Sequence, residues 1–250
     1  MPLNPIHTLL RQCGLITTFV CSLSACQTNQ VSVPDIKPVT NTQTFLVGTF
    51  TKTPNEGIYQ VTVNSKTGAL SPVSVVASST SPSYLAWDKA NARLYAANTA
   101  LGGISYFEQD AETKAFNQVS ELFDIAKGPC HISLSPDGKL LAIANYMSSD
   151  VHFFDVSNNK SIMIDTVKHQ GNGTHQRQKQ SHLHWINWAP DGKFAYSVDL
   201  GTDSVYQYEI SQNKVINHSV AYKTDAEDGP RHIAFHPTSD HAYLLNELSN

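Results

Sequence analysis

The chain has 250 residues, of which 40% are hydrophobic and 15% charged, a balance that supports one sizeable globular core. Its formal net charge is -4 at pH 7 and no basic stripe runs along it, which argues against nucleic acid as a partner. Ten Tyr and ten Phe, with many Val, Thr and Ile, favour strands over helices.

The first residues are typical of an export signal. Arg11 supplies their only positive charge, and the stretch from Cys13 to Leu23 is apolar but too short to span a bilayer as a helix. It ends in Leu23-Ser24-Ala25-Cys26, which resembles a bacterial lipobox. That resemblance predicts a signal peptide over residues 1–25 and lipidation of the Cys26 thiol. An ordinary secretory signal with incidental cysteines is the alternative.

A tether is expected after the lipidated cysteine. Residues 26–43 are mostly polar and include Pro34 and Pro38, a composition that suits a flexible connection to a domain over residues 44–250. Gln27, at the position after Cys26, favours sorting to the outer membrane in a Gram-negative bacterium. We therefore expect the periplasmic side of that membrane, contacted through the lipid alone. Cys130 would then be the only thiol of the mature chain, which leaves no disulfide framework.

The domain is predicted to be built from repeats. Four segments each combine an apolar strand, a turn and a second apolar strand: YLAWDKANARLYAAN from residue 84, HISLSPDGKLLAIAN from 131, WINWAPDGKFAYSVD from 185 and HIAFHPTSDHAYLLN from 232. Their starts lie 47, 54 and 47 residues apart. Repeats of about 40–50 residues made of short strands are typical of propeller blades, which stack because one blade cannot bury both faces alone. We expect an all-β propeller of four-stranded blades, with the strands around the P-D-G turns innermost.

Further strands complete this pattern. An alternating strand is expected over Gly57–Val63, and outer strands over Gly103–Phe107, Asp150–Asp155 and Ser204–Ile210. Between them, Lys168–Ser181 has no apolar residue and accounts for the longest spacing, so it is predicted to be a loop, either mobile or functional. The last repeat stops after its second strand, so we expect about five blades and a truncated C-terminus.

An ordered set of motifs covers residues 44–250: GTFT at 48–51, GPCHISLSPDGKLLAIANY at 128–146, SHLHWINWAPDGKFAYSVDLGTD at 181–203, GPRHIAFHP at 229–237 and NEL at 246–248. Together they resemble the seven-bladed propeller lactonases of the 6-phosphogluconolactonase type, which are related to fungal carboxy-muconate lactonising enzymes. The chain departs from that family at Thr99, where the family often has Glu, and at Ser181, where it has Pro.

The resemblance implies hydrolysis of a sugar lactone, 6-phosphogluconolactone or a related aldonolactone, to the aldonic acid without a cofactor. It places the pore-lining positions at His182, His184, Arg231 and Glu247. Lactone hydrolysis needs an activated water and a group that stabilises the carbonyl oxygen's negative charge. Glu247 or a histidine can take the proton, and Arg231 suits an oxyanion, carboxylate or phosphate. We predict His184, Arg231 and Glu247 as catalytic residues, with Arg231 and Glu247 facing each other.

Other interpretations of these residues stay open. His182 and Tyr146 are predicted to bind substrate, although Tyr146 can instead simply pack. Two histidines two residues apart on a strand point to one face and can bind zinc, but no third ligand follows at a telling spacing, so no metal is predicted. Both can also be structural, and Arg231 and Glu247 can be a salt bridge alone.

The remaining polar residues of the motifs are assigned structural roles. Asp199 and Asp203 are predicted to organise a turn, and Cys130 to be a small buried hydrophobe. His131 and His232 recur at one repeat position, which favours a scaffold role. The rival functions are a non-catalytic binding propeller and a muconate-type lactonising enzyme. Because phosphorylated sugars are largely cytoplasmic, an exported chain favours an unphosphorylated aldonolactone.

Overall fold

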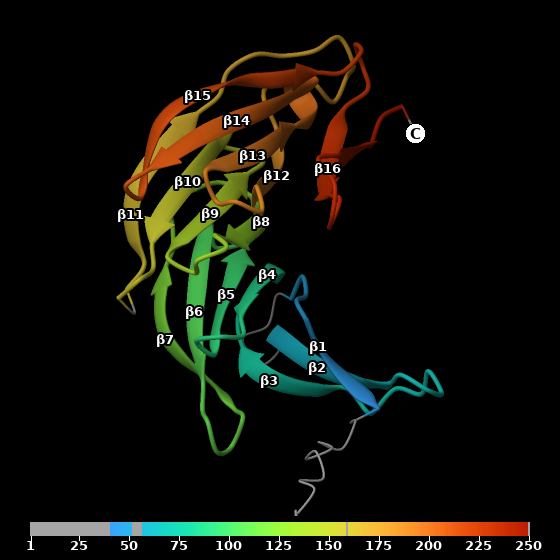
Figure 1. The fold of residues 1–250 in the computed structure, drawn as a ribbon, viewed down its shortest axis with the longest axis vertical. Coiled ribbons are helices and arrows are strands. Elements are labelled where there is room, and N and C mark those ends of the chain that lie inside the picture. The colour runs from blue at the N-terminus through green and yellow to red at the C-terminus, as the bar shows by residue number, and fades with distance from the viewer. Residues whose placement is uncertain (1–40, 52–56, 159, 250) are drawn as a thin grey trace, which may run out of the picture. The chain divides into compact units, whose positions relative to one another are not determined.

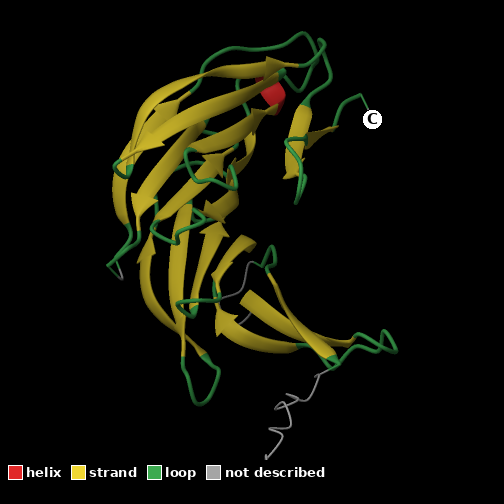
Figure 2. Ribbon diagram, in the orientation of Figure 1, coloured by secondary structure: helices red, strands yellow, loops and turns green. Residues whose placement is uncertain are grey.

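The computed structural model describes residues 41–51, 57–158 and 160–249, all within one compact unit. The expected signal peptide, Cys26 and most of the tether lie outside the described residues. Within the described part, seventeen strands and one short 3₁₀ helix form five antiparallel sheets (Figures 1 and 2). No helix in these ranges has the length and hydrophobicity needed to cross a membrane.

The sheets follow the chain in order. The first sheet consists of β1 (Thr42–Val47), β2 (Gly57–Asn64) and β3 (Ser74–Ser78). The second consists of β4 (Pro82–Asp88), β5 (Arg93–Asn98), β6 (Gly103–Gln109) and β7 (Phe116–Leu122). The third consists of β8 (Pro129–Leu134), β9 (Leu140–Asn145), β10 (Asp150–Asp155) and β11 (Ile162–Lys168). The fourth sheet consists of β12 (Leu183–Trp188), β13 (Phe194–Asp199), β14 (Ser204–Ser211) and β15 (Lys214–Lys223), with η1 (Leu200–Thr202) between β13 and β14. The fifth consists of β16 (Pro230–Phe235) and β17 (Ala242–Asn246). The predicted all-β architecture of four-stranded units is confirmed.

The first strand of each repeat is the inner one. β8 packs against both β4 and β12, and β12 also contacts β16, so these strands meet side by side where successive sheets adjoin. The P-D-G turns are closed locally: Asp137 accepts hydrogen bonds from the Ser135 hydroxyl (2.7 Å) and the Lys139 amide (3.2 Å), while Gly138 takes a positive φ of 71°. The turns therefore set the hairpins that begin with the inner strands.

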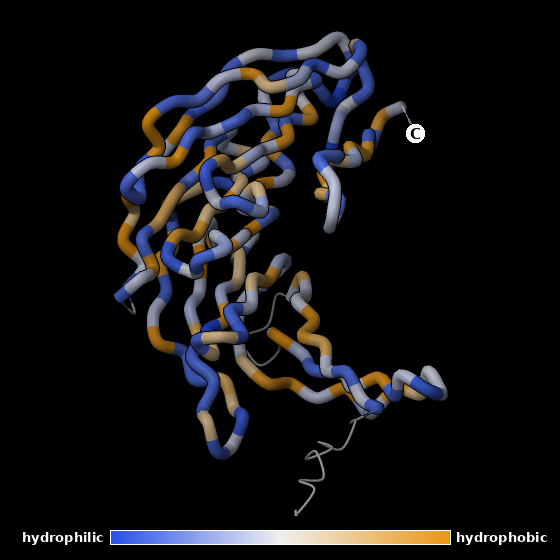
Figure 3. Tube along the Cα trace, in the orientation of Figure 1, coloured by the Kyte–Doolittle hydropathy of each residue, from blue (hydrophilic) through white to orange (hydrophobic). Residues whose placement is uncertain are grey.

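The core lies between neighbouring sheets. Phe153 on β10, Trp188 on β12 and Tyr208 on β14 belong to one buried cluster that joins the third sheet to the fourth. Phe153 meets Tyr208 edge to face, with ring centroids 5.4 Å apart. In Figure 3, apolar residues recur along the strands while the connections are mostly hydrophilic. Burial between sheets, rather than within one, explains why the repeats must stack.

Each inner strand carries the same irregularity near its start. The pairing of β4, β8, β12 and β16 with the following strand skips one residue, as a β-bulge does. The skipped residues are Ser83, Cys130, His184 and Arg231. A bulge bends the strand and redirects the side chain of the extra residue. Two of the three predicted catalytic residues therefore occupy this repeated position.

Candidate active site

In two of the four hairpins the side chain of the skipped residue bonds the side chain sixteen positions later, directly after the second strand of the same hairpin. In the second sheet the pair is Ser83 and Thr99, whose hydroxyls share a hydrogen bond. In the fifth it is Arg231 and Glu247, whose side chains form an ion pair between Nη1 and Oε2. The expectation that Arg231 and Glu247 face each other is confirmed. The Glu247 amide also donates to the Gly229 carbonyl (2.8 Å), which fixes the end of β17 beside the start of β16.

The two histidines of the HxH motif gather around Tyr146, which follows β9. The Tyr146 ring stacks on His182 (centroids 4.2 Å apart, planes at 15°) and meets the His184 ring edge on (5.6 Å, 83°). His182 Nδ1 lies 3.0 Å from the Tyr146 carbonyl, which can only accept, so this nitrogen carries a proton. The His182 amide donates to Asp199 Oδ1 at 2.7 Å. His182 is thus held at both backbone and ring, whereas Tyr146 joins the two imidazoles.

His184 lies beside the ion pair. Its ring centroid is 5.3 Å from that of His232, the neighbour of Arg231 in β16. Burial, the charge of Arg231 and the nearby His232 together lower the pKa of His184 to about 4. Its Nδ1 is buried and has no hydrogen-bond partner among the described residues. At neutral pH the imidazole is therefore uncharged and able to accept a proton.

The structure adds a residue that the sequence did not single out. Arg177, in the loop that links β11 to β12, places Nη2 2.5 Å from Glu247 Oε1. Hydrogen bonds to Glu247 and to the Tyr146 side chain raise the pKa of Arg177. The long polar loop was predicted to be mobile or functional, and its extra length immediately before the HxH motif was the only signal. Its arginine contacts a residue seventy positions later, which no local pattern indicates.

Glu247 therefore holds one arginine on each carboxylate oxygen. Burial by itself raises the pKa of this carboxyl, but the hydrogen bond from Arg177 and the charge of Arg231 outweigh burial and lower it. Glu247 is ionised at neutral pH, and the three groups together carry a net charge of +1. Both carboxylate oxygens of Glu247 contact arginines, whereas His184 is neutral and makes no ion pair with a described residue, which leaves His184 as the candidate proton acceptor.

Neighbouring residues have structural roles. Asp199 accepts from the Gly201 amide at 2.9 Å and caps η1, so its predicted role in a turn is confirmed. His131 is buried between Tyr84 and Trp185, with ring centroids 4.0 and 5.6 Å away, in keeping with a scaffold role. Burial raises the pKa of the Cys130 thiol to about 12, which excludes it as a thiolate nucleophile at neutral pH.

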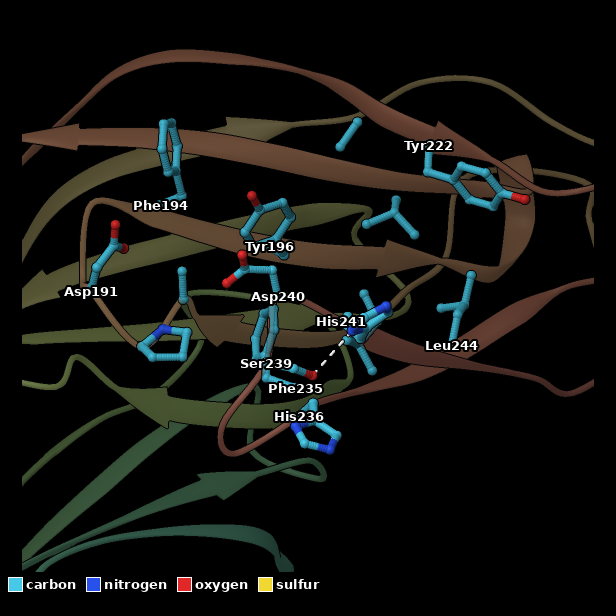
Figure 4. Close-up of a pocket in the computed structure, with 16 residues that line it drawn as sticks. Asp191, Phe194, Tyr196, Tyr222, Phe235, His236, Ser239, Asp240, His241 and Leu244 are labelled. Carbon is cyan, nitrogen blue, oxygen red and sulfur yellow. Dashed lines mark hydrogen bonds between the residues drawn. The ribbon is translucent and has the colours of Figure 1, made fainter.

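Two further observations concern possible metal binding and the position of a nearby cavity. No group of three or more His, Cys, Asp and Glu side chains able to hold a metal ion occurs within the described ranges. A cavity of about 810 Å³ lies between the fourth and fifth sheets, lined by apolar side chains such as Phe194, Phe235 and Leu244 (Figure 4). Its polar lining includes Ser239 and His241, which share a 3.0 Å hydrogen bond. None of the predicted catalytic residues lines this cavity.

Comparison with known proteins agrees with this architecture. Residues 44–250 match the sequence model of the family described as "Lactonase, 7-bladed beta-propeller". A 6-phosphogluconolactonase of Bacillus subtilis is 34% identical over 208 residues, covering 82% of this chain and 59% of the relative. A periplasmic gluconolactonase of Pseudomonas aeruginosa superposes with a TM-score of 0.74 at 27% identity, covering 83% of this chain and 62% of that one.

A putative 6-phosphogluconolactonase of Bacteroides fragilis gives a TM-score of 0.73 at 28% identity, covering 85% of this chain and 63% of that structure. The chain thus spans about three fifths of the length of these relatives. The family match extends over nearly all of the described residues, and the resemblance found in the motifs is confirmed. The chain belongs to the seven-bladed β-propeller lactonase family.

Proposed function

We propose that the protein containing this chain hydrolyses a sugar lactone to its aldonic acid. The observation that carries the proposal is the juxtaposition of a neutral, partly buried histidine, His184, with an arginine, Arg231, that a carboxylate holds in place. This pair supplies a proton acceptor and a fixed positive charge, the two elements that acyl transfer to water needs. The names of the Bacillus and Pseudomonas relatives support the same chemistry.

In the proposed reaction, His184 takes a proton from water as the water oxygen bonds to the lactone carbonyl carbon. Arg231 stabilises the negative charge that develops on the carbonyl oxygen. When the tetrahedral intermediate collapses, the bond from that carbon to the ring oxygen breaks. The proton on His184 passes to the ring oxygen, which leaves as a hydroxyl group. Glu247 keeps the Arg231 guanidinium in position through their ion pair.

The proposed substrate is an unphosphorylated aldonolactone, and the proposed location is the periplasmic side of the outer membrane, reached through a lipidated Cys26. The lipobox-like residues before Cys26 support the location, and the Pseudomonas relative is itself described as a periplasmic gluconolactonase. Mass spectrometry of the mature N-terminus tests the anchor: the expected result is a diacylated or triacylated Cys26, and an unmodified terminus at another residue contradicts it.

The activity is tested with the full-length protein and two substrates, glucono-δ-lactone and its 6-phosphate. Acid release is followed in a pH-stat and spontaneous hydrolysis is subtracted. The expected result is turnover of both lactones, with a higher kcat/KM for the unphosphorylated one. A His184→Gln variant with the wild-type melting temperature serves as the background control. If the protein releases acid from both lactones only at the spontaneous rate, the result contradicts the proposal.

A further inference from the structure

The loop that carries Arg177 is held as firmly as a core segment. Gln178, the next residue, is fully buried. Its Nε2 donates to the Leu200 carbonyl (2.9 Å) and to Asp203 Oδ1 (2.6 Å), and its Oε1 accepts from the His175 amide (3.1 Å). A buried amide with three hydrogen bonds fixes its own backbone. The position of Arg177 is therefore set by its neighbour and not only by its contact with Glu247.

The loop is also closed on itself. The Gly173 amide donates to the Gln178 carbonyl (2.9 Å), and the Gln178 amide donates to the His175 carbonyl (2.8 Å). A Cβ added at Gly173 would lie 2.3 Å from Gln178 Oε1, so only glycine leaves room for the anchoring amide. A turn, a glycine and a buried glutamine therefore all help to hold Arg177 in place.

Both arginines keep donors facing solvent. Arg177 and Arg231 contact Glu247 through one terminal nitrogen each, and their side chains are 46% and 39% exposed, against 16% for Glu247. A guanidinium has five N–H donors in a planar fork, and more of them remain than these contacts use. Exposed ion pairs contribute little to stability, so stability alone is a weak reason for an anchored second arginine.

We propose that Arg177 is a further substrate-binding residue. Together with Arg231 it forms an anion clamp, bridged by Glu247, that binds a substrate or product group with at least two anionic oxygens. This inference rests on the proposed lactone hydrolysis, because the reaction generates such a group. The net charge of +1 favours an anion, and two guanidinium forks on adjacent elements match its oxygens. With the proposed substrate, that group is the carboxylate formed on ring opening; a phosphoryl group elsewhere on the sugar offers the same kind of oxygens, and the test distinguishes the two.

The test uses three variants of the full-length protein. Arg177→Gln removes the charge, Arg177→Lys keeps it without the planar fork, and Lys179→Gln is the matched control on the same loop. Lys179 is exposed and makes no ion pair with another described residue. Isothermal titration calorimetry measures binding of gluconate, which has a carboxylate, and of glucose 6-phosphate, which has only a phosphoryl group. Steady-state kinetics on glucono-δ-lactone give kcat and KM, and circular dichroism checks each fold.

For Arg177→Gln, we expect at least one probe to bind about 10–100-fold more weakly, the loss of a hydrogen bond to a charged group. KM should rise more than kcat falls, Arg177→Lys should be intermediate, and Lys179→Gln should match the wild type. Weaker binding of gluconate alone assigns the clamp to the carboxylate, and of glucose 6-phosphate alone to the phosphoryl group. Unchanged binding of both probes by a folded Arg177→Gln protein overturns the inference.

The outcome separates this inference from the proposed function. A wild-type protein that hydrolyses neither lactone but binds gluconate through Arg177 would refute the reaction and leave the clamp standing. A protein that hydrolyses lactones equally well with and without Arg177, and binds both probes equally, would refute the clamp alone.

Discussion

Gln178 and Asp203 are joined by a buried hydrogen bond of 2.6 Å from Nε2 to Oδ1 across 25 residues. The same oxygen accepts from the Gly229 amide at 2.9 Å, two residues before Arg231. One carboxylate therefore ties the loop of Arg177 to the start of the strand that carries Arg231. The separation of the two arginines therefore depends on Asp203, although no hydrogen bond or ion pair joins Asp203 to either of them in the described structure.

Replacing Asp203 by Asn should loosen this link without disturbing the backbone. The φ of Asp203 is 52°, a conformation that asparagine also tolerates, so the change acts on the acceptors. We expect the free energy of unfolding to fall by about 1–3 kcal/mol, the cost of leaving buried donors poorly paired. KM should rise while kcat changes less. Urea denaturation and steady-state kinetics measure both, with the exposed Asp240→Asn as control; equal stability of the two variants would contradict the prediction.

Replacing Arg231 by Ala should impair catalysis far more than stability. Loss of one oxyanion-stabilising group typically lowers kcat by about 10²–10³, and we expect that range for kcat/KM. The ion pair with Glu247 is partly exposed, and Glu247 keeps Arg177 as a partner, so the melting temperature should change little. If the pair is only a structural salt bridge, the pattern reverses: a lower melting temperature with normal turnover per folded molecule.

The activity should depend on pH through His184. Its pKa is about 4 in the substrate-free site, and a base must be unprotonated to accept a proton from water. We expect kcat/KM to stay level through neutral pH and to fall only as the pH approaches 4. An acid limb with a midpoint between pH 6 and 7 would instead indicate an ordinary, exposed histidine and would remove His184 from this role. NMR titration of the imidazole gives an independent value.

The stability of the fold should also respond to acid. Burial is the main cause that lowers the pKa of His131 to about 3, and of His169 and His184 to about 4, below the ordinary value of 6.5. In the unfolded chain these imidazoles bind protons at higher pH, so unfolding takes up protons between about pH 6.5 and 3. Stability should therefore fall as the pH falls through this window. His169→Gln should reduce that slope, measured by urea denaturation at several pH values; an unchanged slope would contradict the assignment.

Much of the fold could be predicted because the same strand–turn–strand pattern recurs four times at similar spacings. Alternating strands and P-D-G turns located the hairpins, and β10 covers the same residues as expected, Asp150–Asp155. Strand ends elsewhere shifted by one or two residues because pairing with the neighbour, and not local propensity, decides where a ladder stops. The assignment of residues 1–43 to a signal and a tether stays a prediction.

The site was predictable only in part. Arg231 and Glu247 lie in one hairpin, so their meeting follows from strand pairing. Arg177 escaped prediction because its loop has no periodicity and its partner is remote in sequence. The burial of Gln178 was equally hidden, since a polar residue in a polar loop gives no sign that its amide will replace backbone partners inside the protein.

At most strand positions one residue both pairs with the neighbouring strand and presents a side chain. The skipped residue near the start of each inner strand presents a side chain without pairing with the following strand. Ser83, Cys130, His184 and Arg231 take no place in the register with the following strand, so their side chains can vary in chemistry while the paired residues around them keep the sheet intact. Each of these four hairpins thus has one position whose side chain is free of the sheet's register. A redesign for another substrate can substitute these side chains one hairpin at a time without changing the pairing of the strands.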